Sequence, residues 1–238
     1  MASSDQKKYE DFVNHSTASA SSEVVFLYGK ASAEFIKGYR GIDNQNGFRF
    51  NKSHKDISSY RINPEFKDNN IKQQAGFSAE VLYTSKENAR RILEGDPNRV
   101  ARSDDTRMGT NHPVVDHVVV DKKGNIIDGS GSQMKFVNDE KTLIKRIAEG
   151  EGGGKTDLSR YRGKKLLLPT EQVETAKAFC DEQAKQYDKA HEELIKKNEI
   201  EKAKVAKERA DYYRQAKKDI LLRPTLSKAF HPGLCEVG

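Results

Sequence analysis

The clearest hydrophobic pattern lies in the middle of the chain. Over residues 69–93, apolar positions recur mostly every third or fourth residue, which predicts a helix, either continuous or broken near residues 84–85. The β-branched run 114–120 (VVDHVVV) predicts a strand. A tight turn at 121–124 and extended residues at 130–137 then complete a predicted hairpin.

The pattern continues with a second helix and a further strand. Residues 139–148 carry leucine and isoleucine at helical spacing, and Asp139 is a suitable N-cap. The short run 164–168 (KKLLL), followed by Pro169, predicts a buried strand. With a weak strand near 100–103, the predicted order is helix, three strands, helix and strand.

The two flanks are less regular. Residues 1–22 are polar and rich in serine and alanine, and we expect a loose arm, followed by a short strand or helical turns from residue 24. Residues 40–69 are predicted to be irregular. Residues 170–222 contain no proline or glycine and predict either one long helix or a hairpin that turns near 197–198.

Composition narrows the class of protein. Of the 238 residues, 35% are hydrophobic and 33% charged, and no apolar run approaches the roughly 20 residues that a membrane helix needs. The first residues contain no apolar leader, so we expect a cytoplasmic protein without membrane contact. Two cysteines are too few for a disulfide scaffold or a four-cysteine zinc site. The net charge of +6 permits a nucleic-acid partner.

Candidate chemistry lies on the predicted hairpin. Asp116 is near the start of one strand, and Gln133 and Lys135 are two residues apart on the next, so these two side chains should share a face. A carboxylate and an amide oxygen, with water, suit Mg²⁺ or Mn²⁺. Lys135 beside the metal could orient a water or stabilise charge on a phosphate. One carboxylate binds a metal weakly, and Glu80 on the preceding helix is the candidate for a second, beside a Gly76 that we expect to allow close packing on the sheet.

These residues and the order of elements together resemble the PD-(D/E)XK nuclease superfamily in its Gln-x-Lys variant. The resemblance covers roughly residues 69–172 and implies an α/β (α+β) fold with a restriction-endonuclease-like αβββαβ core. It also implies metal-dependent hydrolysis of nucleic acid, with DNA as the expected substrate, Glu80, Asp116 and Gln133 as metal ligands and Lys135 as the catalytic lysine. Two departures are Val115 in place of the family's proline and Gln133 in place of an acidic residue.

The resulting organisation has three parts. Residues 1–68 form an N-terminal extension, 69–169 the nuclease-like core, and 170–238 a helical appendage that could mediate self-association or bind a partner protein. The role of a defence or toxin effector is compatible with the same site. A non-catalytic nucleic-acid or protein-binding module with a nuclease-like fold is the alternative.

Other residues compete for these roles or add to them. Asp121 is a second choice for the strand acid, although its DKKG context is typical of a turn. His117 should point away from Asp116 and behave as an ordinary histidine. The glycine-rich stretch 150–156 lacks the spacing of a phosphate-binding loop. Five residues are candidates for contact with nucleic-acid phosphates: His112, Arg160, Arg162, Lys164 and Lys165.

Overall fold

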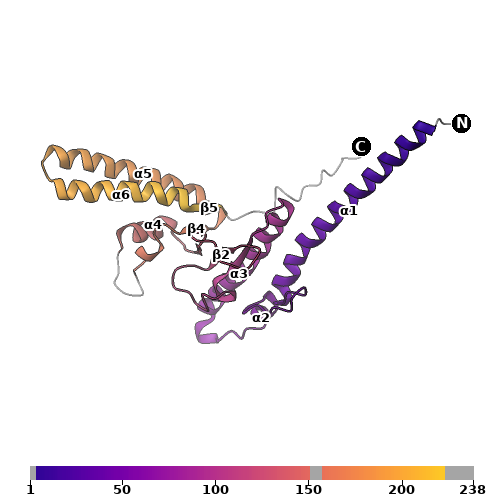
Figure 1. The fold of residues 1–238 in the computed structure, drawn as a ribbon. Helices are drawn as coiled ribbons and strands as arrows, with labels where there is room; N and C mark the ends of the chain where they lie inside the picture. The colour runs from indigo at the N-terminus through magenta and orange to yellow at the C-terminus, as the bar shows by residue number, and fades with distance from the viewer. Residues whose placement is uncertain (1–3, 151–156, 223–238) are drawn as a thin grey trace, which may run out of the picture.

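The computed structural model describes residues 4–150 and 157–222, which form six α-helices around a five-stranded mixed sheet (Figure 1). The helices are α1 (Ser4–Arg40), α2 (His54–Ser58), α3 (Lys67–Leu93), α4 (Glu140–Glu149), α5 (Thr170–Lys196) and α6 (Ile200–Asp219). The strands are β1 (Arg99–Arg102), β2 (His117–Val120), β3 (Ser132–Met134), β4 (Lys165–Leu168) and β5 (Ile220–Leu222).

The sheet has an antiparallel half and a parallel half. Its strands lie in the order β1-β2-β3-β4-β5. The pairs β1–β2 and β2–β3 are antiparallel, and the pairs β3–β4 and β4–β5 are parallel. The predicted succession of helix, three strands, helix and strand is confirmed by α3, β1, β2, β3, α4 and β4. The strand β5 was not predicted, because its three residues follow a helix-forming stretch without a break.

Helix α3 covers one face of the sheet and runs unbroken through residues 84–85. Ala79 and Tyr83, one helical turn apart, pack with Val100, Met134 and Leu167 from three different strands. The expected close packing at the helix's glycine is wrong, because a Cβ at residue 76 would meet no atom within 4 Å. The apolar face of α3 therefore begins after that glycine.

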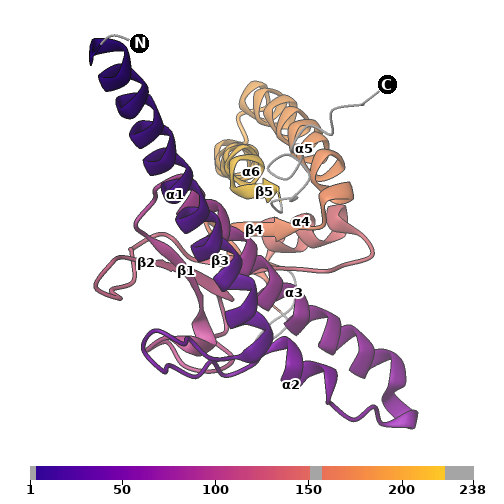
Figure 2. The ribbon, with the colours of Figure 1, turned by 90° about the vertical axis from the view of Figure 1, so that its right-hand side faces the viewer.

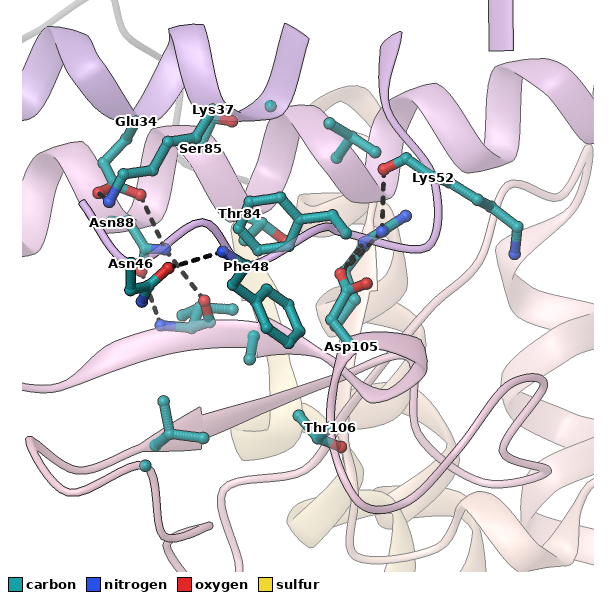
Figure 3. A pocket seen from close by; sticks show the side chains of 18 of the residues that line it. Glu34, Lys37, Asn46, Phe48, Lys52, Thr84, Ser85, Asn88, Asp105 and Thr106 are labelled. Atoms are coloured by element: carbon teal, nitrogen blue, oxygen red, sulfur yellow. Dashed lines mark hydrogen bonds and ion pairs between the residues drawn. The ribbon is translucent and has the colours of Figure 1, made fainter. Parts of the chain in front are cut away.

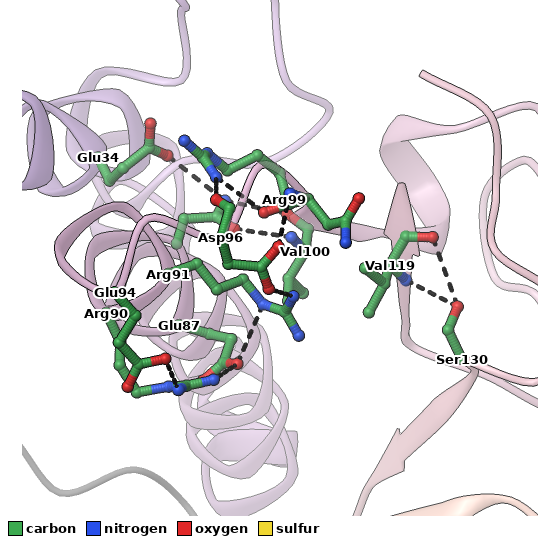
Figure 4. A network of polar contacts seen from close by, with 12 residues as sticks. Glu34, Glu87, Arg90, Arg91, Glu94, Asp96, Arg99, Val100, Val119 and Ser130 are labelled. Carbon is green, nitrogen blue, oxygen red and sulfur yellow. Dashed lines mark hydrogen bonds and ion pairs between the residues drawn. The ribbon is translucent and has the colours of Figure 1, made fainter. Parts of the chain in front are cut away.

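The end of α3 is joined to the sheet by polar contacts (Figure 4). The side chain of Asn88 accepts a hydrogen bond from the backbone N–H of Val100 at 2.7 Å and donates to its carbonyl at 3.0 Å. Buried Glu87 accepts hydrogen bonds from Arg90 at 3.0 Å and Arg91 at 3.1 Å. The contacts of Asn88 set the position of α3 along β1, and those within α3 satisfy the buried carboxylate of Glu87.

The expectation of a loose N-terminal arm is wrong, because residues 4–40 form the single helix α1. Its C-terminal half packs Ala31 against Ala89 and Ile92 of α3, and a packed segment allows a helix to propagate cooperatively beyond the contact. Gly38 permits the close approach, since a Cβ there would lie 2.3 Å from the hydroxyl of Ser85. The N-terminal half of α1 projects past α3 (Figures 1 and 2).

The other face of the sheet is covered by α4, α5 and α6 (Figure 1). Asp139 caps α4 as predicted, accepting hydrogen bonds from the backbone N–H groups of residues 141 and 142. Helices α5 and α6 form a hairpin, and Asn198 adopts a left-handed conformation (φ 58°) at the turn. Of the two predicted alternatives for this segment, the hairpin is correct.

No helix in the described ranges is both long and apolar enough to cross a bilayer. The glycine-rich stretch considered as a phosphate loop lies largely outside the described residues, as does the chain beyond residue 222.

Tyr213 of α6 lies at the centre of an aromatic cluster. Its ring stacks on Tyr187 at a centroid distance of 5.9 Å and meets Phe179 and Tyr212 edge-on at 6.1 and 5.5 Å. The side chain is fully buried, and its hydroxyl has no hydrogen-bond partner within the described part of the chain. The ring therefore contributes packing while the hydroxyl carries a desolvation cost.

We expect Tyr213→Phe to leave the free energy of unfolding unchanged or to raise it by about 1 kcal/mol, because it removes a buried, unpaired hydroxyl. Tyr213→Ala should lower it by about 3 to 5 kcal/mol through loss of the ring. Urea denaturation followed by circular dichroism measures both. A clear loss of stability in Tyr213→Phe would contradict the unpaired hydroxyl.

Candidate functional site

Asp116 lies immediately before β2 and is held by both neighbouring strands. Its backbone N–H donates to Ser132 at 2.8 Å, and its carbonyl accepts from the N–H of Ser103 at 2.8 Å. Its carboxylate Oδ2 accepts the backbone N–H of Met134 at 2.8 Å and the side-chain amide of Gln133. The structure thus brings Asp116 and Gln133 into direct contact.

Lys135 follows β3 and lies close enough to act on Asp116. Its backbone N–H donates to Leu167 at 3.1 Å, and its ammonium lies 5.0 Å from the ring centroid of Tyr161. Burial raises the pKa of Asp116, and the hydrogen bond from Met134 and the charge of Lys135 only partly oppose this rise. The neighbouring hydrogen bonds and positive charge therefore do not fully compensate the Asp116 carboxylate for its burial.

Glu80 projects from α3 and experiences the charge of Asp116. Burial, followed by repulsion from Asp116, raises the pKa of Glu80 to about 7, although the charges of Arg102 and Lys52 lower it. The Glu80 carboxylate accepts no hydrogen bond from any residue in 4–150 or 157–222. A partly buried carboxylate without a donor is costly unless it binds a proton or a cation.

His117 is a core residue that contacts the helix carrying Glu80. Its ring is buried, meets Tyr83 edge-on at 4.8 Å, and places Nε2 3.2 Å from the backbone carbonyl of Glu80. Burial lowers the pKa of His117 to about 4, so the ring is neutral at pH 7. With Nε2–H donating, the ring helps to fix the turn of α3 that carries Glu80.

Two ion pairs near the site were not predicted from the sequence. Lys52 pairs with Asp104 at 2.7 Å, and its ammonium lies 4.0 Å from the ring centroid of Phe77. Arg102 pairs with Asp105 at 2.7 Å and donates to the carbonyl of Lys52 at 2.9 Å. The segment RVARSDD, with an arginine on the buried face of a strand just before two acids, was the available signal.

Asp104 belongs to the same electrostatic group as the two carboxylates. Burial raises the pKa of Asp104, but hydrogen bonds from Lys52 and the backbone of Asn111 outweigh this and hold it below its ordinary value. Its negative charge in turn raises the pKa values of Glu80 and Asp116. Asp104 therefore contributes to the electrostatics of the site.

The predicted phosphate-binding residues mostly have partners within the chain. Arg162 donates to the carbonyls of residues 147 and 148 at 2.9 and 2.6 Å, at the C-terminal end of α4. Lys165 pairs with Asp219 at 2.9 Å, and Arg160 donates to residue 113 at 3.1 Å. Lys164 has no ion pair within the described ranges.

His112 and Asp121 also serve local structure. His112 Nδ1 lies 3.3 and 3.2 Å from the backbone nitrogens of Val114 and Val115 and accepts their hydrogens. Asp121 accepts hydrogen bonds from Lys123 and Asn125 at 2.8 Å, as its turn sequence predicted. Asp121 is therefore a turn residue of the hairpin.

The residues that could hold a cation at this site are the two acids Glu80 and Asp116. Within the described ranges, no three His, Cys, Asp or Glu side chains are arranged to bind a metal. Glu80 and Asp116 supply two carboxylates, the number with which Mg²⁺ is commonly held when waters and phosphate oxygens complete its shell. A cation would also relieve the repulsion that raises the pKa of Glu80.

No protein-family model, curated protein or solved structure matches this chain.

The raised pKa of Glu80 predicts a pH-dependent stability in the absence of metal. Folded Glu80 keeps its proton up to about pH 7, whereas in the unfolded chain it loses it near its ordinary value of 4.5. The folded state therefore binds more protons in this window, so this group's contribution to the free energy of unfolding falls as pH rises through it. Relative to the wild type, Glu80→Gln should gain on the order of 1 to 3 kcal/mol between pH 4.5 and 8.

The stability of Glu80→Gln must be compared with that of the wild type at each pH, because His117 contributes a pH dependence of the opposite sign. Its folded pKa of about 4 lies below its ordinary value of 6.5, so its contribution to stability rises with pH between these values. The substitution at Glu80 leaves that contribution in both proteins, and their difference isolates the carboxylate. A difference that is constant from pH 4 to 8 would contradict the raised pKa.

The contacts of the basic residues separate their roles. We expect Arg162→Ala to lower the free energy of unfolding by about 1 to 3 kcal/mol, because it removes two hydrogen bonds to carbonyls at a helix end. Lys164→Ala should change stability by less than about 0.5 kcal/mol. If Lys164 contacts phosphate, its loss should lower the salt slope of nucleic-acid binding by about one. An unchanged slope would exclude that contact.

Proposed function

We propose that this protein is a metal-dependent nuclease that hydrolyses phosphodiester bonds, with DNA as the expected substrate. The observation that carries the proposal is the Asp116 carboxylate, which contacts Gln133 and lies within electrostatic reach of Glu80 and Lys135. These four residues come from α3, the start of β2, and β3 with its following residue. They are the residues expected from the resemblance to the Gln-x-Lys variant of the PD-(D/E)XK superfamily.

Each residue has a role in the proposed reaction. Glu80 and Asp116 would hold Mg²⁺ or Mn²⁺, with Gln133 as an amide ligand once its side chain turns its oxygen toward the ion. The bound metal would polarise the phosphate and lower the pKa of a water molecule. Lys135 would orient the attacking water and stabilise negative charge on the phosphate as it is attacked.

Two features of the fold support this assignment. The order α3, β1, β2, β3, α4 and β4 agrees with the αβββαβ core that the resemblance implies. The catalytic groups sit on strand ends and a packed helix, where backbone hydrogen bonds hold them in place, as Asp116 illustrates. Preorganised groups of this kind are needed for electrostatic catalysis.

A non-catalytic binding module is the second candidate. The observation in its favour is that Gln133 donates its amide N–H to Asp116 and therefore stabilises the carboxylate in place of a cation. In such a protein the four residues would hold β2 against β3, and binding would use the surrounding surface.

A cleavage assay on labelled single- and double-stranded oligonucleotides tests the proposal. We expect strand scission that needs Mg²⁺ or Mn²⁺ and is abolished by EDTA. Lys135→Ala should lower its rate about 100-fold or more, because the residue acts on the reacting phosphate. The matched control is Lys185→Ala, which removes an exposed lysine on α5 and should leave the rate unchanged.

Asp116→Ala should also abolish cleavage, but it removes hydrogen bonds between strands, so its melting temperature must be measured in parallel. Wild-type protein that binds the metal yet cleaves no substrate would reject the nuclease and favour the binding module. Lys135→Ala with full activity would reject the role of Lys135 and with it this active site.

A further inference from the structure

A cavity of about 400 Å³ lies between α1, α3, the turn 41–50 and the β1–β2 end of the sheet (Figure 3). Its volume is in the range of small-molecule sites, and its lining is mostly apolar. Lys52 and Arg102 line it and also act on the charge of Glu80, so the cavity adjoins the carboxylate site. None of the four proposed catalytic residues lines it.

Phe48 presents an aromatic ring to this cavity from a well-fixed turn (Figure 3). Its backbone N–H donates to the side chain of Asn46 at 2.9 Å, and its carbonyl accepts from Asp43 at 2.8 Å. Phe50 supports the ring edge-on at a centroid distance of 5.3 Å. Yet Phe48 is 46% exposed, so much of its surface is available for a flat ligand to stack on.

Ser85 of α3 places a hydroxyl at the same cavity (Figure 3). The residue is only 4% exposed, and its hydroxyl makes no hydrogen bond to any residue in 4–150 or 157–222. A hydroxyl at a cavity wall can both donate to and accept from a ligand. The cavity therefore combines an aromatic face with a polar group that lacks a partner.

The cationic side chains around the cavity differ in whether they already form an ion pair. Lys37 pairs with Glu34 at 2.9 Å, and Lys52 pairs with Asp104 at 2.7 Å. Arg107 also lines the cavity, is exposed, and has no ion pair or hydrogen bond from its side chain within the described residues. A ligand with a flat ring and an adjoining negative charge would complement this arrangement.

We propose that the cavity receives one unpaired base of a single-stranded nucleic acid. The base stacks on Phe48, its polar edge meets the hydroxyl of Ser85, and Arg107 binds a neighbouring phosphate. A base held in a duplex stack cannot enter such a cavity without being extruded, so a single strand is the matching ligand. This inference rests on the proposed nuclease in one respect, because the bound base would set which phosphate reaches Glu80 and Asp116.

Binding is measured by fluorescence anisotropy with a labelled single-stranded DNA oligonucleotide in EDTA, where no cleavage occurs. We expect Phe48→Ala to weaken binding about tenfold or more, since stacking of a base on an aromatic side chain contributes strongly to affinity. Phe48→Tyr, which keeps the ring, should bind within about twofold of the wild type. The matched control is Phe66→Ala, because Phe66 is also exposed and does not line the cavity.

A 2-aminopurine base in the same oligonucleotide reports on stacking itself. Its fluorescence should be quenched on binding to the wild type and to Phe48→Tyr, and quenched much less by Phe48→Leu, which keeps an apolar side chain without a ring. Arg107→Ala should lower the salt slope of binding by about one. Melting temperatures of all variants exclude loss of folding as the cause.

The outcomes separate this inference from the proposed function. Cleavage by the wild type, with Phe48→Ala binding as well as Phe66→Ala, would reject the base site and keep the nuclease. Binding that depends on Phe48 without any cleavage in Mg²⁺ would keep the base site and reject the nuclease. No binding of single strands, or binding of duplex with the same dependence on Phe48, would overturn the base site.

Discussion

The junction between β2 and β3 is the constraint on which the site depends. These strands share a single register pair, His117 with Ser132, yet they join the antiparallel half of the sheet to the parallel half. The Asp116 carboxylate strengthens this junction through its bonds to Met134 and Gln133. The same side chain thus serves the sheet and the proposed chemistry, so stability and function are coupled at one residue.

The charged residues around this junction fall into two groups, acids with raised pKa values and cations that are already paired. Glu80 and Asp116 both have raised pKa values, and the charge of Asp116 contributes to that of Glu80, while Lys52 and Arg102 are already paired with other acids. Lys52 and Arg102 are thus committed to other acids, and the charge of Lys135 only partly offsets the burial that raises the pKa of Asp116. Such imbalance is common at functional sites because a protein tuned only for stability would neutralise it.

The local spacing of apolar and turn residues explains how much of the fold and site could be predicted from the sequence. The elements from residue 69 to 169 carry periodic apolar residues and clear turn signals, and their order was predicted correctly. The contact between Asp116 and Gln133 follows from strand geometry. By contrast, Lys52 approaches Asp104 across about fifty positions of chain, and α1 is stabilised by packing on α3, so neither appears in a local pattern. The pairing of β5 with β4 is similarly non-local.

The parallel pairing of β4 with β5 gives the α5–α6 hairpin a role in the sheet. Parallel neighbours require a crossover connection, and the two helices are that connection, so they are part of the sheet's topology and not an appendage. An antiparallel helical pair returns its own end to its starting point, which reduces the entropy lost in closing so long a loop. During synthesis the fifth strand leaves the ribosome only after both helices, so the sheet can be completed only once residues 170–222 have been made.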